Sequence, residues 1–424
     1  MSTLRAAPLV VLGLAFVACS DDAEVLSPPD SGGDVTVDAP ALPDAAADAT
    51  DATVDAADAA DAAVDVEAGP LVCDTDAGLD ACGGKCVTLA TDAKNCGFCG
   101  HDCQGAACSS GLCAPQVLAT GQANPIAIAV NSTNVYFLNN ATGGTDGQLV
   151  SCPVTGCPNP IVPLSKALDN PTALTLDGTN VYWINSSALN QTKGTGMKCP
   201  LAGCGATNQN RTTLFTGIAT PRTIAVDATK IYFGGWGTGS PNFFNGKVYS
   251  CAIGGCGAAP TTVVTPLIRA SALGIDATDL YVASAGQIPS IVRAALGSSG
   301  AGTVMDMQKD YSSLVVGTAV LYWTDFGNGD VYMCPKLNCT SNAIVLFSNQ
   351  AGPDQIKVDG QGIYWLNTVS GEVRACPGGV CNGKTTLLAK TGDTLVALAL
   401  SGSYAYYATQ DVNGTAGKIY RVAR

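Results

Sequence analysis

Histidine is nearly absent from this sequence, and charged residues are scarce. Only one of the 424 residues is a histidine, His101, and only 13% are charged. Catalysis by a serine–histidine–aspartate triad is therefore excluded away from His101. The 21 Lys and Arg residues are outnumbered by 34 Asp and Glu residues, so the chain also lacks the basic surface of a nucleic-acid-binding protein. No nucleic-acid partner is expected.

Long apolar runs are also missing. The run from Ala6 to Ala18, which follows Arg5, has thirteen residues, whereas a membrane-spanning helix needs about 20. Such a short run behind a basic residue predicts a secretory signal peptide over residues 1–18. Strands and helices do not alternate along the chain, and no glycine-rich loop leads from a strand into a helix. A TIM barrel and a phosphate-binding loop are therefore excluded.

The end of the apolar run carries a motif. Phe16-Val17-Ala18-Cys19 resembles the lipobox of bacterial lipoproteins, although that family usually has leucine at the place of Phe16. The resemblance implies a lipidated Cys19 that anchors the protein outside the cytoplasm, at the outer membrane or cell surface of a Gram-negative bacterium. A plain signal peptide followed by a coincidental cysteine is the alternative. One lipidated cysteine also accounts for the odd total of 19.

Residues 19–72 are low in complexity and strongly acidic. From Asp21 to Glu67 there are fourteen Asp and Glu residues and no Lys or Arg. Leaving out these charges and that of Arg5 brings the net charge from −13 to zero, so the acidity belongs to this segment. Repeated like charges and prolines, without an apolar face, predict a disordered tether that holds a globular head away from a membrane.

Eight cysteines crowd residues 73–113, and disulfides are predicted to stabilise a segment too small for a large core. A zinc half-site at Cys96 and Cys99 is the alternative. The spacing from Cys86 to Cys99 resembles a short module of exported Gram-negative proteins, which carries no activity that can be transferred. The pairing stays open for six of the eight cysteines, namely Cys73, Cys82, Cys86, Cys96, Cys99 and Cys103.

Residues 114–424 contain a repeat built around an aromatic dipeptide. Successive copies begin at Tyr136, Tyr182, Tyr232, Tyr281, Tyr322, Tyr364 and Tyr406, at intervals of 46, 50, 49, 41, 42 and 42 residues. A period of about 40–50 residues with four short apolar runs is typical of β-propeller blades. The sequence therefore predicts an all-β fold with a seven-bladed propeller. Tyr322-Trp323-Thr324-Asp325 resembles the YWTD propeller family, which usually has six blades, so six is the alternative.

The ends of the repeat predict how the ring closes. The last unit stops after the run Lys418–Ala423, while a spare apolar strand, Gln116–Ala119, precedes the first unit. Supplying the spare strand to the last blade would remove free sheet edges. The first run of each unit, such as Ile126–Val130, is almost entirely apolar and is expected to form an inner strand buried on both faces.

A Cys-x4-Cys pair marks the third run of five units, and each pair is predicted to form a disulfide. These pairs are Cys152/Cys157, Cys199/Cys204, Cys251/Cys256, Cys334/Cys339 and Cys376/Cys381. The fourth unit has Ala295 and Gly300 at these positions, so both cysteines are absent together, as expected for a bonded pair. Cys108 and Cys113 share the spacing and are predicted to pair as well.

Several acidic residues stand at turns, where a metal is one interpretation and a turn cap is the other. Asp177, Asp227, Asp276 and Asp359 follow the first run of their units. An aspartate there is expected to cap a tight turn through backbone hydrogen bonds. The loop Asp325–Asp330 could hold calcium, but a hairpin turn is the prediction. No metal site, catalytic site or cofactor is predicted.

The longest loop offers a candidate ligand site. Within Gly234–Asn245, the three aromatic residues Trp236, Phe243 and Phe244 could stack on a sugar or a partner protein. Packing back onto the blade is the alternative. The propeller is accordingly predicted to be a monomeric scaffold that binds a protein or polysaccharide and is not an enzyme.

A hydrolase resembling calcium-dependent lactonases is the alternative function. Such enzymes line the propeller channel with several acidic and amide side chains. Polar residues on the predicted inner strands include Asp354 and Gln355, with Arg222 and Lys357. These are too few for a metal cage, so binding is favoured over catalysis.

Overall fold

Strands are the regular elements of the described part of the chain. The computed structural model describes residues 71–424, except 141–143, 188–191, 206, 240–242, 244, 287–288, 308–310, 340–341, 380–382, 412 and 414–415. These residues form 32 strands and no helix long and apolar enough to span a membrane. Cys19, the predicted signal peptide and nearly all of the predicted tether lie outside the described residues.

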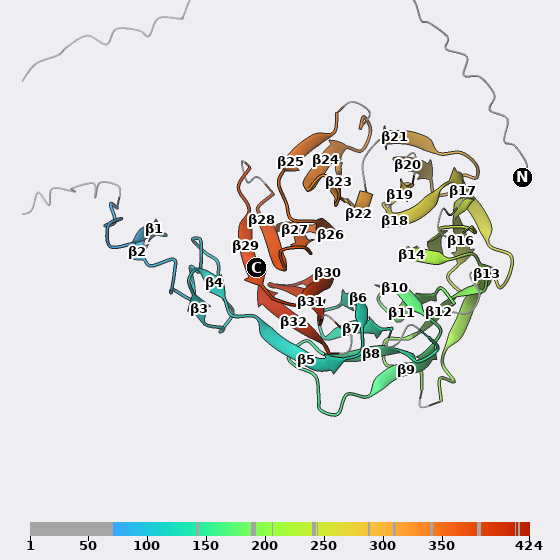
Figure 1. The fold of residues 1–424 in the computed structure, drawn as a ribbon, viewed down its shortest axis with the longest axis horizontal. Coiled ribbons are helices and arrows are strands. Elements are labelled where there is room, and N and C mark those ends of the chain that lie inside the picture. Colours follow the sequence, from blue (N-terminus) through green and yellow to red (C-terminus); the bar gives the residue numbers. More distant parts are fainter. Residues whose placement is uncertain are drawn as a thin grey trace, which may run out of the picture. The chain divides into compact units, whose positions relative to one another are not determined.

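Seven four-stranded antiparallel sheets form the blades of a propeller, each running from an inner strand a to an outer strand d (Figure 1). Blades 1 to 3 consist of β6 (Pro125–Val130), β7 (Asn134–Asn139), β8 (Gly147–Pro153), β9 (Pro163–Leu168); β10 (Pro171–Leu176), β11 (Asn180–Asn185), β12 (Gly194–Pro200), β13 (Thr212–Ile218); and β14 (Pro221–Val226), β15 (Lys230–Gly235), β16 (Gly246–Ala252), β17 (Thr261–Leu267).

Blades 4 to 6 repeat the same order. They consist of β18 (Arg269–Ile275), β19 (Asp279–Ala285), β20 (Ser290–Ala295), β21 (Thr303–Met307); β22 (Tyr311–Val316), β23 (Val320–Asp325), β24 (Asp330–Pro335), β25 (Ile344–Phe347); and β26 (Pro353–Asp359), β27 (Gly362–Asn367), β28 (Glu372–Pro377), β29 (Thr386–Lys390).

Blade 7 joins the two ends of the propeller sequence. It consists of β30 (Thr394–Ser401), β31 (Tyr404–Gln410), β32 (Gly417–Ala423) and β5 (Gln116–Gln122). β5 runs antiparallel to β32, with Ala119 opposite Ile419. The predicted closure by the spare strand is therefore confirmed, and the ring has seven blades rather than six.

The second strand of each blade, and not the first, is the most buried. In β15, Ile231 to Gly235 are all buried, whereas Ile126, Ala127, Ala129 and Val130 of the inner strand β6 are only partly buried. The expectation that strand a is buried on both faces was therefore wrong, because the inner strands border the centre of the ring. Aromatic residues of the second strands fill the spaces between blades; Trp183, Trp323 and Trp365 are fully buried there.

The turns between strands a and b are capped by aspartate, as predicted. The Oδ1 atom of Asp227 accepts hydrogen bonds from the backbone N–H groups of Thr229 at 2.6 Å and Lys230 at 2.7 Å. The hydroxyl of Tyr232 donates to Oδ2 at 3.1 Å. Burial raises the pKa of Asp227, but these hydrogen bonds outweigh it and hold the pKa below its ordinary value. The same turn recurs at Asp177 and Asp276.

Disulfides staple the c–d loops of the blades, again as predicted. Four of the five pairs are bonded, namely Cys152–Cys157, Cys199–Cys204, Cys251–Cys256 and Cys334–Cys339. Cys376 is also disulfide-bonded, and Cys381 lies outside the described residues. These loops and the a–b turns share one side of the propeller, which we call the disulfide face. The b–c and d–a loops lie on the opposite face.

The cysteine-rich module is held together by four disulfides. It contains two short hairpins, β1 (Asp80–Cys82) with β2 (Lys85–Val87) and β3 (Cys108–Ser109) with β4 (Leu112–Cys113). The bonds are Cys73–Cys86, Cys82–Cys99, Cys96–Cys108 and Cys103–Cys113. Cys96 and Cys99 are thus in separate disulfides, so they do not offer the thiolates of a zinc half-site.

The predicted Cys108–Cys113 bond was wrong. The two residues lie opposite each other in the β3–β4 hairpin, but their sulfur atoms bond to Cys96 and Cys103 instead. Blade 7 shows the reason. Val422 of this blade lies opposite Ala405, and the equivalent residue of blade 3 is Cys251, which lies opposite Ile231. The first cysteine of the usual pair is therefore a valine in this blade.

The module packs against blades 6 and 7. Cys96, Cys103 and Cys113 share one buried cluster with Val422 and Ala423 of β32 and with residues of blade 6. Cys113 lies three residues before the start of β5, so it precedes the last strand of blade 7 as the second cysteine of a c–d loop precedes the last strand of its own blade. The module therefore continues the core at the closing blade, on the disulfide face, from which β5 starts.

Candidate functional site

The candidate site on the opposite face is built around Trp236. This residue directly follows β15 and is partly buried. The guanidinium carbon of Arg222 lies 4.7 Å from the centroid of the indole ring, and that of Arg269 lies 5.6 Å away. Arg222 belongs to the inner strand β14 and Arg269 begins the inner strand β18. The indole therefore brings together two arginines from adjacent blades, in what we call the Trp236 cluster.

The aromatic loop folds back rather than forming a flat platform. Phe243 is only 8% exposed and meets Trp236 edge-on, with ring centroids 5.2 Å apart and an interplanar angle of 69°. Phe244 lies outside the described residues. Phe243 therefore packs back onto the blade, which was the alternative prediction. Trp236 mainly forms cation–π contacts with the two arginines.

Both arginines of the cluster are available to an acidic ligand. Neither forms an ion pair within the described part of the chain, and the buried Nε of Arg222 has no hydrogen-bond partner. Burial lowers the pKa of Arg222, although a guanidinium stays protonated at physiological pH. A carboxylate or sulfate could satisfy these donors in the bidentate geometry that guanidinium groups favour.

Sequence reasoning missed part of this face. Arg269 was not a candidate, because only the pairing register places it beside Trp236. Phe326, which follows β23, is 44% exposed, and Val369 is 72% exposed. Both side chains lie close to Gly352, so they form a small apolar patch between blades 5 and 6. The exposed aromatic residue Phe326 was inside the predicted Asp325–Asp330 turn.

That turn has the predicted hairpin structure. The backbone N–H of Asn328 donates to Oδ1 of Asp325 at 3.0 Å, and its side-chain amide donates to Oδ2 at 2.7 Å. The N–H of Gly329 donates to the backbone oxygen of Asp325 at 3.0 Å. Asp325 is fully buried, so its carboxylate is occupied by the turn itself.

The inner strands surround a central cavity of about 230 Å³. Three of the four polar inner-strand residues noted in the sequence line it, namely Arg222, Gln355 and Lys357. The fourth, Asp354, accepts a hydrogen bond from the backbone N–H of Gln355 at 2.7 Å. The cavity therefore gathers cations and amides rather than the cluster of carboxylates that a calcium cage needs.

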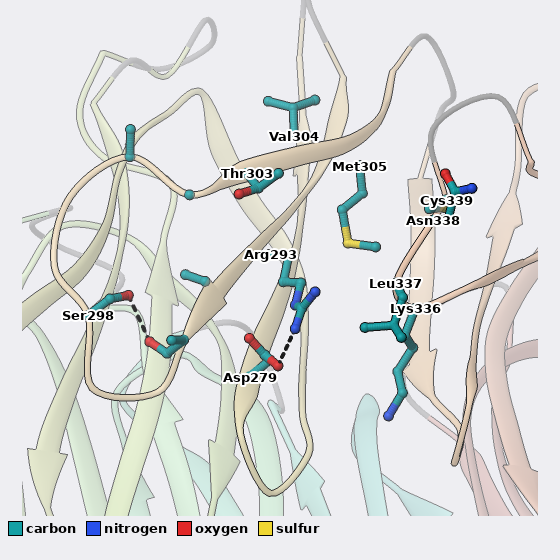
Figure 2. A pocket seen from close by; sticks show the side chains of 14 residues that line it. Asp279, Arg293, Ser298, Thr303, Val304, Met305, Lys336, Leu337, Asn338 and Cys339 are labelled. Carbon is teal, nitrogen blue, oxygen red and sulfur yellow. Dashed lines mark hydrogen bonds and ion pairs between the residues drawn. The ribbon is translucent and has the colours of Figure 1, made fainter.

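A second cavity, of about 350 Å³, lies on the disulfide face between blades 4 and 5 (Figure 2). It borders the c–d loop of blade 4, which lacks the disulfide. Its charged side chains are already paired, since Arg293 lies 2.7 Å from Asp279 and Lys336 lies 2.7 Å from Asp276. This pairing leaves the cavity less suited to a charged ligand than the Trp236 cluster.

His101, the single histidine, has a structural position. It is only 4% exposed and stacks on Phe98 with ring centroids 4.5 Å apart. Its Nδ1 lies 2.6 Å from the backbone oxygen of Cys96, and its Nε2 lies 3.2 Å from that of Ala423. The imidazole therefore links the module to the end of β32 and is remote from the central cavity.

Comparisons with known proteins agree with both parts of this architecture. The model of the stigma-specific STIG1-like protein family matches residues 62–116, which span the disulfide-rich module. No curated protein matches the chain. Among solved structures, virginiamycin B lyase from Staphylococcus aureus is 11% identical, with a TM-score of 0.53, over 73% of this chain and 98% of that one. The WD40 propeller domain of Doa1 is 11% identical, with a TM-score of 0.52, over 72% and 96%.

These structural likenesses show the fold alone. The same fold serves a lyase and a WD40 domain, so it does not separate catalysis from binding. One related structure is a catalytically inactive form of the lyase, in which a histidine is replaced by alanine, with quinupristin.

Proposed function

We propose that this protein is a lipid-anchored, extracytoplasmic binding protein, whose propeller captures an acidic protein or glycan at the Trp236 cluster. The observation that carries the proposal is the pair of arginines, Arg222 and Arg269, held on one indole, neither of which forms an ion pair among the described residues. Arginine and tryptophan are the residue types most enriched at energetically important binding positions.

The position of the cluster supports the proposal. The cluster lies on the face opposite the disulfide loops, whereas the module that follows the tether packs at the disulfide face. A tether from Cys19 would then leave the cluster free to meet ligands. The exposed side chains Phe326 and Val369 on the same face add apolar contact area.

Binding fits the described residues better than hydrolysis does. Among the residues that line the central cavity, the charged side chains are both cations, Arg222 and Lys357. A lactonase-type reaction would need a cage of oxygen ligands around calcium. Turnover of a lactone that is abolished by Asp354→Ala would reverse this conclusion.

Replacing Arg269 by alanine is expected to weaken ligand capture at least tenfold, which corresponds to about 1.4 kcal/mol. Trp236→Ala should have a similar effect, because the arginines then lose their support. The measurement is a glycan array, together with co-purification from membrane extracts, using the purified full chain. Tyr404→Leu is the matched control, since Tyr404 carries Arg421 at 4.4 Å in a comparable pair elsewhere. Equal capture by all variants would remove the cluster as the site.

Replacing Cys19 by alanine is expected to move the protein from the membrane fraction to the soluble fraction. Several acyl chains on one residue give stable anchoring, whereas a processed chain without them has only its polar tether near the bilayer. Mass spectrometry of the N-terminal peptide measures the acyl mass directly. A wild-type protein that fractionates as soluble, with an unmodified Cys19, contradicts the anchor but leaves the binding proposal untouched.

A further inference from the structure

The central cavity is lined by all seven inner strands, and one of them is built differently. In six strands, the residue opposite the tyrosine of the aromatic dipeptide is small or apolar: Ala129, Thr175, Ala225, Gly274, Val315 and Ala399. In β26 this residue is Lys357, opposite Tyr364. A long cationic side chain therefore stands where the repeat otherwise places little volume and no charge.

The backbone of β26 is reshaped at this point. Gln355 has a φ of +51°, a left-handed conformation that non-glycine residues rarely adopt. All seven inner strands have a register shift near their start, and in β26 it extends from Asp354 to Lys357. In each of the other six inner strands, the residue one position before the equivalent of Lys357 is aliphatic and lines the cavity. These residues are Ile128, Leu174, Ile224, Leu273, Leu314 and Leu398. In β26 the equivalent Ile356 does not line the cavity and is fully buried in the core between blades 5 and 6.

The irregular backbone thus turns an aliphatic side chain away from the cavity and admits Lys357. Bulges that re-aim a side chain, and residues held in strained conformations, are concentrated at functional sites. Of the seven inner strands, all of which the structure describes, β26 is the one with a non-glycine residue at positive φ. The unusual backbone at Gln355 therefore indicates that Lys357 has a specific role in the cavity.

The charged side chains that line the cavity are all cationic. Lys357 and Arg222 both line it, and neither forms an ion pair in the described part of the chain. Asp354, the acidic group that acts on Lys357, has its own pKa raised by burial. Burial lowers the pKa of Lys357, opposed in part by Asp354. The carboxyl group that acts on Lys357 is thus one that burial disfavours as an anion, and Arg222 has no ion-pair partner in the described part of the chain.

The hydroxyl groups of the lining do not balance the two positive charges, because they are neutral, and three of them are held by backbone oxygens. Thr172 donates to Pro221 at 3.1 Å and Ser271 to Ala283 at 3.0 Å. Ser312 lies 2.9 Å from the backbone oxygen of Pro353. These hydroxyl oxygens can still accept hydrogen bonds, but they carry no charge. What the cavity lining lacks is an anion, because it contains no Asp or Glu residue.

We propose that the cavity binds a small oxyanion, of the carboxylate or inorganic phosphate type, between Lys357 and Arg222, with the amide of Gln355 as a further contact. A volume of about 230 Å³ is several times the roughly 30 Å³ that one water occupies in the liquid, so a small anion fits and a macromolecule does not. This site shares Arg222 with the Trp236 cluster but is distinguished from it by Lys357, which does not belong to that cluster.

Calorimetric titration of the purified full chain with sodium acetate, and separately with inorganic phosphate, tests the proposal at low salt and pH 7. Sodium chloride is the reference salt. One site with a preference for one of the two anions is expected, and Lys357→Met should weaken it at least tenfold. Lys166→Met is the matched control, because it removes the same charge from an exposed position on β9 and should bind like the wild type.

The pH dependence gives a second readout. For acetate, whose own charge is constant in this range, affinity should fall as pH rises from 7 toward 10, because Lys357 loses its proton at a lowered pKa, while Arg222 stays charged and Asp354 becomes more fully ionised. If Lys357→Met does not fold, Arg222→Gln must show the same loss. Absence of anion binding by the wild type, or unchanged binding by the folded variants, overturns the proposal. Loss of macromolecular capture in Arg269→Ala with intact anion binding would separate the two sites.

Discussion

Replacing Leu118 by aspartate is expected to lower the free energy of unfolding of the propeller by about 4 kcal/mol or more. Leu118 lies in β5, is 6% exposed, and packs in one cluster with Phe137 of blade 1 and Ile419 of blade 7. Truncating a buried leucine alone costs about 2–5 kcal/mol, and an unpaired buried carboxylate adds a desolvation penalty. The substitution also acts at the one blade whose strands come from both ends of the propeller sequence.

The adjacent residue provides the matched control. Val117 belongs to the same strand but is 50% exposed, so Val117→Asp should change the free energy of unfolding by less than about 1 kcal/mol. Urea unfolding, followed by tryptophan fluorescence and circular dichroism, measures both variants. Similar effects of the two substitutions would contradict a ring that depends on the burial of β5.

The architecture was predictable because several local signals agree on one register. The aromatic dipeptides, the aspartate-capped turns and the Cys-x4-Cys pairs recur in a fixed order, and each has a local physical cause. Asp227 caps its turn through neighbours two and three residues away, and Cys251 bonds to a cysteine five residues away. The closure of the ring by β5 could be predicted by counting strands, since the last unit lacked one strand and a spare strand preceded the first unit.

What the sequence did not predict depends on contacts between distant segments. Cys108 and Cys113 have the spacing of a blade disulfide, but the decisive difference is Val422, more than 300 residues away. Arg269 reaches Trp236 only because adjacent blades place their inner strands side by side. The orientation of Lys357 depends on the φ of Gln355, which no residue pattern specifies. Such features arise from tertiary structure, so a single sequence contains little signal for them.

Removing the Cys103–Cys113 disulfide by a double alanine substitution is expected to destabilise the whole propeller by roughly 3 kcal/mol. The bond closes a loop with a sequence separation of 10, and the chain-entropy relation gives about this value for such a loop. Both sulfur-bearing residues are 1% exposed and share the buried cluster that includes Val422 and Ala423. The loss should therefore appear in the unfolding of the blades and not only in the module.

The Cys73–Cys86 disulfide is the informative comparison. Its sequence separation of 13 gives a similar entropic contribution, but neither cysteine belongs to the cluster shared with blades 6 and 7. Double alanine substitution there should loosen the start of the module and leave the unfolding midpoint of the propeller within about 1 °C. Thermal unfolding by near-UV circular dichroism, with limited proteolysis of the module, distinguishes the two. If the propeller responds equally to both pairs, or to neither, the module is not part of the closure of the ring. A response confined to Cys103–Cys113 means that the eight-cysteine segment replaces, at blade 7, the short stapled loop of the other blades.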